Sequence, residues 1–482
     1  MYDAAILVVI EAALLAAVII LREPKLLIPA VILGLPFEYA NTQLLNSWGS
    51  TGIHGALRAF LNPGKTAMLA TIIVATVRMR HRPARLFPDS QILIPILLIF
   101  VVTVAGLAWS DSRRPDSSVL VMAMYIAFLF AAPSLIENRR DLERIIGAIL
   151  IAAAVLGAVA LAQRFLHVFE WRSYLLSQGA YRSNATFADP NILARYLVIS
   201  ITLAAILVLS TGPRRTTVYL ALPTLALGAA GVVATGSRSG LGVLVLCLFL
   251  AVLVAPIQRP TKAKLLGVAA CGVLLVLIML LVGGGATADR LKSLTNINGA
   301  LGRRTYLIDG GWHMFLDNPL TGVGTGNFQN QLLTNYRHLI PYWGFDVSLS
   351  HTSVITIAAE NGLLGLFALG FAVVRIAWTV VRTYFASGDH FHRLFTGWLG
   401  IALLAIFLES QSEGRLLDEP YLYLLLAILV AVELGATAVV REAVTSVTSK
   451  PAAAVPESLP SPPSPAPTHP ALTRNSEFGS RN

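Results

Sequence analysis

Long apolar stretches recur along most of the chain, separated by shorter polar segments. A helix of about 20 apolar residues spans the hydrocarbon core of a bilayer, so this pattern predicts an all-α polytopic bundle of about twelve or thirteen transmembrane helices. The predicted spans fall near residues 4–21, 26–40, 66–78, 91–109, 118–136, 145–163, 191–210, 217–235, 240–256, 265–283, 352–381, 395–409 and 421–440.

Composition supports the same class of protein. The chain has 482 residues, of which 55% are hydrophobic and 13% charged, and its mean hydropathy is +0.69. A soluble domain of this length could not bury so much apolar surface, which excludes soluble, fibrous, nucleic-acid-binding and disulfide-framework proteins. Cys247 and Cys271 both lie inside apolar stretches, so we interpret them as small buried hydrophobes and not as a disulfide or metal ligands.

Basic residues cluster in alternate loops, around residues 78–85, 139–144, 214–215 and 259–264. The positive-inside rule places these loops in the cytoplasm. We therefore expect a multi-pass protein of the bacterial inner membrane whose chemistry takes place on the periplasmic side. The predicted outer segments are 110–117, 164–190, 235–239, 284–350 and 410–420, although Arg113, Arg114, Arg172 and Arg182 run against the rule.

Composition changes after residue 441. Eight prolines lie between Pro451 and Pro470, and such a segment cannot bury a core. We predict a transmembrane domain over residues 1–441 and a disordered Pro-rich tail over 442–482. The stretch from Asn475 to Ser480 resembles a cloning scar and is left out of the fold prediction.

The segment 284–350 is the longest polar excursion between two predicted spans. Apolar residues spaced by three and four predict an amphipathic helix near 303–316, at the membrane edge, that Asp317-Asn318-Pro319 ends. The glycine run from Gly322 to Gly326 follows. It allows close backbone approach to a ligand or another helix, or forms a plain turn, and its context excludes a dinucleotide-binding loop.

Two residues in the outer segments are candidates for chemistry. Arg238 stands between small residues where one apolar stretch ends and the next begins; it either extends to lipid phosphates or binds a bulky anion. His351 lies where the long outer segment meets the next span, and it could accept a proton or be structural. His313 and His338 are weaker rivals in the same segment.

Other charged positions carry weaker signals. Arg182 begins a stretch that ends in Asp189-Pro190-Asn191, an N-cap signal for the next helix. Glu409 and Asp418 belong to an acidic turn that either pairs with an arginine, holds a sugar hydroxyl or is simply solvated. Glu413, Arg415 and Glu419 complete that turn.

Five motifs follow one another at set spacings along the chain. They are Gly236-Ser237-Arg238, then Gly302-Arg303-Arg304, then Phe315-x-Asp317-x-Pro319-Leu320-x-Gly322-Val323-Gly324-x-Gly326-x-Phe328, then His351-Thr352, then Glu360-Asn361-Gly362-Leu363-Leu364-Gly365. Taken in order, these motifs resemble the O-antigen ligase and polymerase superfamily, and the likeness spans roughly residues 180–370. Thr352 and Ile308 stand where the family often has asparagine and an aromatic residue.

The resemblance implies a transferase that takes a glycan from undecaprenyl diphosphate on the periplasmic side. The acceptor would be the lipid A core in a ligase, or another lipid-linked glycan in a polymerase. By position, His351 matches the catalytic histidine, Arg238 one diphosphate-binding arginine, and Arg304 a second one, with Arg303 as its neighbouring alternative. Two guanidinium groups could hold the leaving diphosphate without a metal ion or other cofactor, and direct displacement would invert the anomeric centre.

Two other functions remain open. A protein side chain could replace the glycan acceptor, as in an O-oligosaccharyltransferase. Alternatively, intramembrane arginines could form the binding site of a non-enzymatic transporter of an anionic solute. The sequence contains no internal repeat of the kind that transporters usually have, which favours the transferase.

Overall fold

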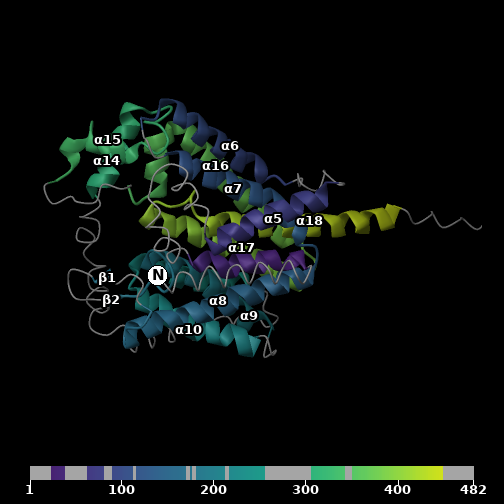
Figure 1. The fold of residues 1–482 in the computed structure, drawn as a ribbon. Helices are drawn as coiled ribbons and strands as arrows, with labels where there is room; N and C mark the ends of the chain where they lie inside the picture. Colours follow the sequence, from purple (N-terminus) through teal and green to yellow (C-terminus); the bar gives the residue numbers. More distant parts are fainter. Residues whose placement is uncertain are drawn as a thin grey trace, which may run out of the picture. The chain divides into compact units, whose positions relative to one another are not determined.

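A computed structural model describes residues 23–37, 62–80, 90–111, 115–169, 174–175, 181–211, 217–255, 305–341 and 350–448. Almost all of this part of the chain is helical (Figure 1), which confirms the predicted all-α bundle. Its α-helices are α2 (Leu27–Gly34), α5 (Pro63–Met79), α6 (Leu93–Ala105), α7 (Pro115–Ala131), α8 (Arg139–Leu166), α9 (Pro190–Thr211), α10 (Leu222–Thr235), α11 (Arg238–Val254), α14 (Thr305–Asp317), α15 (Phe328–Leu333), α16 (Ser353–Ala386), α17 (His390–Glu413) and α18 (Pro420–Thr448).

Short elements complete the description. Helices of the 3-10 type are η1 (Pro24–Leu26), η2 (Leu35–Phe37), η5 (Gly106–Trp109), η6 (Ala132–Leu135) and η9 (Arg337–Leu339), and η7 (Thr217–Ala221) is a π-helix. The strands β1 (Tyr174–Leu175) and β2 (Tyr181–Arg182) pair antiparallel, with Tyr174 opposite Arg182.

The helices of the described ranges have the length and composition of membrane spans. Five are long and apolar enough to cross a bilayer: Ser118–Leu135, Arg139–Leu166, Pro190–Ser210, Ser353–Ala386 and His390–Glu413. Shorter apolar helices occupy Pro24–Phe37, Leu93–Trp109, Tyr219–Thr235, Arg238–Val254 and Pro420–Gly435. The spans predicted at 4–21 and 265–283 lie outside the described residues.

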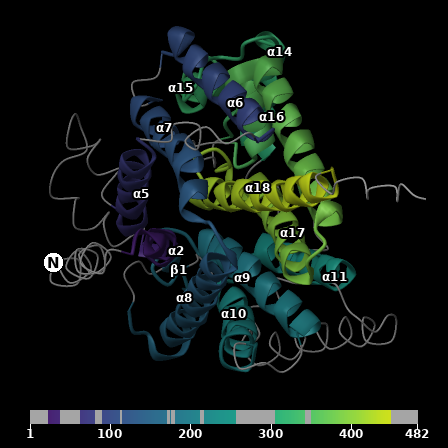
Figure 2. The ribbon, with the colours of Figure 1, turned by 90° about the vertical axis from the view of Figure 1, so that its right-hand side faces the viewer.

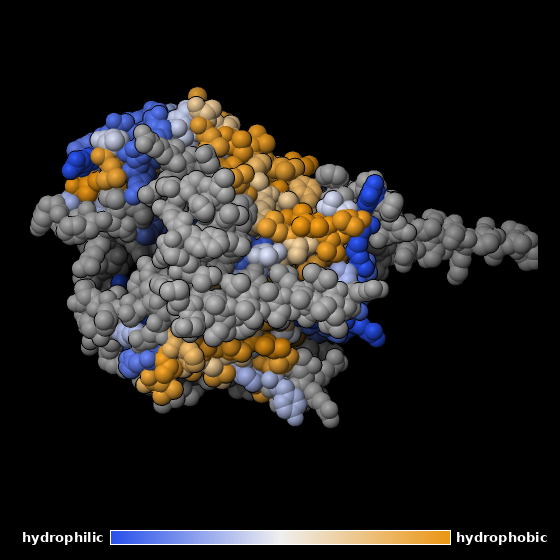
Figure 3. Space-filling model, viewed as in Figure 1, coloured by the Kyte–Doolittle hydropathy of each residue, from blue (hydrophilic) through white to orange (hydrophobic). Residues whose placement is uncertain are grey.

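Apolar side chains also cover the flanks of the helices. Figure 3 shows hydrophobic surface over α6 and α16 and again over α8 and α10, whereas hydrophilic residues gather over α14 and α15. Exposed large hydrophobes include Val101, Val155, Phe367, Val374 and Trp378. So much exposed apolar surface on helix flanks fits contact with lipid, and we conclude that this is a multi-pass membrane protein.

Helices α8, α9 and α10 pack against one another, and α17 contacts α9, α11 and α16 (Figure 2). Trp398 of α17 is fully buried, and its indole N–H donates to the Ile199 carbonyl of α9 over 3.0 Å. Helix α17 therefore connects the group of α8, α9 and α10 to α16. Cys247 is buried in α11, as predicted; Cys271 lies outside the described residues.

The amphipathic helix predicted near 303–316 is α14, and Asp317-Asn318-Pro319 ends it as expected. Tyr306, Leu307 and Met314 pack inward, and α14 lies against α16. Trp312 and Leu316 are exposed on its other face. The location of that face at a membrane edge stays a prediction.

Contacts join the described parts of the predicted outer segments at one end of the bundle, called the shared end below. Gly324 lies against Ser110, the Ser183 N–H donates to the Ala234 carbonyl over 3.1 Å, and the Ser412 hydroxyl donates to Ser239 Oγ over 3.1 Å. The positive-inside rule assigned these segments to one side of the membrane from charge alone, and their described parts lie close together in the fold.

Contacts divide the chain into the unit Met1–Thr437 and the unit Ala438–Asn482. The domain boundary predicted after residue 441 falls within α18, which runs to Thr448. Residues 449–482, with most of the predicted tail, lie outside the described residues, so the domain division stays a prediction.

Candidate functional site

Arg238 is the first residue of α11. Helix α10 ends at Thr235, and Ser237 caps α11 because its hydroxyl accepts from the Gly240 N–H over 3.2 Å. The Arg238 side chain is exposed. A guanidinium group at a helix N-terminus adds its charge to the positive end of the helix dipole, so this position suits an anionic ligand.

His351 occupies a tight turn just before α16. Its backbone is left-handed, with φ 57°, a conformation that few residue types other than glycine adopt readily. Ser350 stabilises the turn: its hydroxyl donates to the Thr352 carbonyl over 2.7 Å and accepts from the Thr352 N–H over 3.1 Å. The half-buried His351 is therefore held in a defined place at the shared end.

The last turn of α17 and its C-cap, Ser410–Gly414, lie next to both candidates. On one side Ser412 bonds to Ser239, next to Arg238. On the other side, the Ser353 hydroxyl donates to the Ser410 carbonyl over 3.0 Å, and Gly414 lies against the His351 backbone. The predicted histidine and one predicted arginine thus flank a single helix end, although they are 113 residues apart (351 − 238).

Arg303 and Arg304 lie outside the described residues. They directly precede α14, which begins at Thr305 and packs against α16. Their part in the site stays a prediction.

Arg182 supports the frame of the site. Its Nε donates to the Thr235 carbonyl over 2.7 Å, and its Nη2 donates to Asn191 Oδ1 over 2.7 Å. It thereby ties the end of α10 to the start of α9. The predicted N-cap there is confirmed, because Asp189 Oδ1 accepts from the Asn191 N–H over 2.7 Å.

The acidic turn is not a solvated loop, because most of its carboxylates face a buried arginine that sequence reasoning missed. Arg195 of α9 is fully buried and forms ion pairs with Glu413 and Glu419. Glu409 is 1% exposed, and neither carboxylate oxygen has a hydrogen-bond partner among the described residues. The sequence did contain a signal for this ion pair, because Arg195 stands alone within an apolar span and an arginine there needs an acidic partner.

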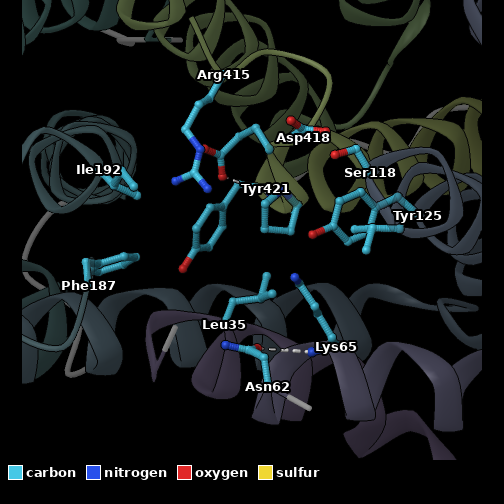
Figure 4. Close-up of a pocket in the computed structure, with 13 residues that line it drawn as sticks. Leu35, Asn62, Lys65, Ser118, Tyr125, Phe187, Ile192, Arg415, Asp418 and Tyr421 are labelled. Carbon is cyan, nitrogen blue, oxygen red and sulfur yellow. Dashed lines mark hydrogen bonds between the residues drawn. The ribbon is translucent and has the colours of Figure 1, made fainter. Parts of the chain in front are cut away.

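Two cavities adjoin at Ser118 and Asp418. The first, of about 160 Å³, lies between η2 and the start of α5 on one side and the loop before α18 on the other. In Figure 4, Lys65, Arg415 and Tyr125 extend into this space, and Tyr421 borders it. Desolvation raises the pKa of the Asp418 carboxyl above its ordinary value, although Arg415 and Lys65 act in the opposite direction. Sequence reasoning singled out Asp418 but not Lys65.

The second cavity, of about 240 Å³, extends toward His351. Ser353 and Gly414, which flank the histidine turn, line it together with Glu360, Asn361 and Asp418. At Met122, Leu416 and Leu417 it adjoins a third cavity of about 720 Å³ among α6, α11, α16, α17 and α18. The lining of this third cavity is mostly apolar, so an apolar space lies beside the second cavity within the bundle.

The glycine run packs against a helix. Gly322 and Gly362 both have positive φ, 68° and 61°, and a Cβ on Gly322 would lie 2.3 Å from the Glu360 carbonyl carbon. The Leu363 N–H donates to the Pro319 carbonyl over 2.7 Å, and α16 kinks at Gly362. The sequence left open whether this backbone approaches a ligand or another helix. In the structure it approaches a helix, α16.

Among the described residues, no three His, Cys, Asp or Glu side chains gather as metal ligands. Metal independence stays a prediction.

These observations define a multi-pass membrane protein with a cationic group, a histidine and a polar cavity at one end of its helices. Residues 223–370 match a family model described as O-Antigen ligase. The matched region runs from α10 to the middle of α16 and includes Arg238, His351 and the glycine run. The resemblance to the O-antigen ligase and polymerase superfamily is thereby confirmed for this region, and it supports a glycosyltransferase of that general type. Comparison with curated proteins gives no match.

Proposed function

We propose that this protein is an O-antigen ligase-like glycosyltransferase. It would move a glycan from undecaprenyl diphosphate to the lipid A core at the periplasmic face of the bacterial inner membrane. The observation that carries the proposal is the turn Ser410–Gly414, which brings the start of α11, with Arg238, and the His351 turn to one helix end. The apolar cavity of about 720 Å³ beside the polar one supports a substrate that carries a lipid chain.

In this reaction the neutral His351 imidazole accepts the proton of the acceptor hydroxyl. The hydroxyl oxygen attacks the anomeric carbon as the bond from that carbon to the diphosphate oxygen breaks, and the anomeric centre inverts. The electron pair leaves with undecaprenyl diphosphate. Arg238 and Arg304, or Arg303 in its place, stabilise the charge that develops on this leaving group, and no metal or cofactor takes part.

The test is transfer by the purified full-length protein from lipid-linked glycan to lipid A core, in the presence of a chelator, with product detected on a gel. Arg304→Ala should lose most of this activity, whereas Arg337→Ala, which removes an exposed charge from the same outer segment, should retain it. Substantial transfer by Arg304→Ala would remove that residue from the mechanism, and dependence on added metal would refute metal independence.

A deletion strain separates ligase from polymerase. Loss of all glycan from lipid A, with accumulation of lipid-linked polymer, indicates a ligase. Attachment of single repeats indicates a polymerase that joins two lipid-linked glycans. Uptake of an anionic solute into proteoliposomes without glycan transfer would instead favour the transporter.

A further inference from the structure

One face of α16 lines the second cavity. Ser353, Thr356 and Glu360 stand three and four residues apart, so they share one side of the helix, and all three line the cavity of about 240 Å³. This polar face begins two residues after His351 and extends about 10 Å along α16, at about 1.5 Å per residue. A single water needs only about 10–15 Å³ of such space, so the cavity has room for a much larger ligand.

Glu360 has a fixed position in this cavity wall. Its Oε1 accepts from the Phe328 N–H over 3.2 Å, and its backbone carbonyl accepts from the Gly324 N–H over 3.0 Å. The residue is only 8% exposed, and it lines the cavity. A carboxylate has about four acceptor sites, so this group can bind a ligand while the protein fixes its orientation.

The second cavity is acidic. Glu360 and Asp418 line it, and no Lys, Arg or His of the described residues does. Arg415 and Lys65 act on Asp418, whereas the charged group that acts on Glu360, within the same described ranges, is the Asp418 carboxyl. Carboxylates accept hydrogen bonds and repel anions. This lining therefore suits a neutral ligand with many hydroxyl donors, which is the chemistry of a sugar.

We propose that Glu360 binds a hydroxyl group of a neutral acceptor sugar in the second cavity, and thereby positions another hydroxyl of that glycan for His351. The ligand is the acceptor and not the donor diphosphate, because the cavity is acidic and Arg238 does not line it. This inference rests on the proposed function, because it assigns a binding residue for the second substrate of the same reaction.

The test uses the full-length protein in lipid nanodiscs, with a lipid A core that ends in a neutral hexose as acceptor. Glu360→Gln keeps the size of the side chain and an oxygen for the Phe328 N–H, but it removes the carboxylate. Acceptor binding, measured directly, should weaken by about tenfold or more, and the acceptor KM should rise equally, the usual effect of losing a hydrogen bond to a charged group. The kcat and the donor KM should each change less than about twofold on the same scale.

Glu433→Gln is the matched control. Glu433 is also buried, accepts from the Ser90 hydroxyl over 2.6 Å, and lines none of the three cavities. This variant should bind acceptor as the original protein does. Unfolding temperatures measured for both variants show whether each is folded.

Acceptors that each lack one hydroxyl of the terminal sugar test the same contact from the ligand side. The original protein should bind one of these deoxy acceptors about tenfold more weakly than the parent. Glu360→Gln should bind that deoxy acceptor and the parent within about twofold of each other, because the contact is already lost. A terminal hexuronic acid should weaken binding to the original protein more than binding to Glu360→Gln, because its charge repels the carboxylate.

The outcomes are distinct. Unchanged acceptor binding by folded Glu360→Gln, equal weakening in Glu433→Gln, or a rise only in the donor KM would each overturn the proposal. Undiminished binding of every deoxy acceptor by the original protein would also overturn it, and this measurement does not depend on the folding of a variant. Glu360-dependent acceptor binding without any glycan transfer would uphold the sugar site and refute the proposed transferase.

Discussion

Arg195 shows how one residue holds the shared end together. It lies in α9, and its partners Glu413 and Glu419 are 218 and 224 residues away along the chain. Its guanidinium therefore anchors the end of α17 and the loop before α18. Sequence analysis missed this arginine, although an arginine within an apolar span needs an acidic partner. Its partners lie too far away along the chain for the sequence alone to identify them.

Replacing Arg195 with methionine should strongly destabilise the protein. Two carboxylates would stay buried without their partner, and breaking a buried ion pair in this way costs about 3–5 kcal/mol. Thermal unfolding in detergent measures the effect, with exposed Arg382→Met as the control. Adding Glu413→Gln and Glu419→Gln should recover part of the stability; an Arg195→Met protein as stable as the control would refute this role.

At the scale of elements, the glycine run and the kink of α16 form one structural unit. The Val323 and Gly324 N–H groups donate to the carbonyls of Ala359 and Glu360, over 2.8 and 3.0 Å. Gly362 provides the kink that exposes these carbonyls. The unit fixes the first part of α16, and therefore the position of the adjacent histidine turn.

Gly322→Ala should destabilise this unit by more than about 1 kcal/mol, because alanine at positive φ is strained and its Cβ would meet the backbone of Glu360. Gly370→Ala is the matched control, since a Cβ on Gly370 has nothing within 4 Å. Unfolding temperatures of the two variants measure the difference. Equal stabilities would show that the close approach is not needed.

The exposed face of α14 gives a second prediction at this scale. If Trp312 and Leu316 rest on the membrane, a fluorophore on Leu316→Cys should be quenched by spin-labelled lipid, because that side chain would lie among acyl chains. A fluorophore on Asn335→Cys, an exposed residue beyond α15, should be quenched much less. Both are made with Cys247 and Cys271 replaced by alanine. Equal quenching at the two positions would place α14 away from the bilayer.

Across the whole molecule, the sequence predicted the structure of single segments but not the contacts between segments that are far apart along the chain. Apolar periodicity located the helices of the described residues, and motif spacing located Arg238 and His351. The first of the two adjoining cavities combines Lys65 of α5, Ser118 of α7 and Asp418 near α18. No local pattern joins residues so far apart, so their common cavity became visible only in the fold.

The basic loops predict the orientation of the molecule in the membrane. If they are cytoplasmic, a membrane-impermeant maleimide added to intact cells with a permeable outer membrane should label Arg337→Cys at the shared end. It should label Arg139→Cys, in a basic cluster, only after lysis. The background again lacks Cys247 and Cys271, and the reverse labelling pattern would place the shared end in the cytoplasm.

The central claim is that His351 performs the proton transfer at the shared end. Its most direct measurement is the kcat of glycan transfer by purified His351→Ala, compared with His313→Ala, since His313 lies in α14 and its Nδ1 is 2.9 Å from the Asp309 carbonyl oxygen. We expect kcat to fall by about 10²–10⁴ in His351→Ala, with unchanged binding of donor lipid, and to stay near its original value in His313→Ala. Retained kcat in His351→Ala, or equal loss in both variants, would contradict this account.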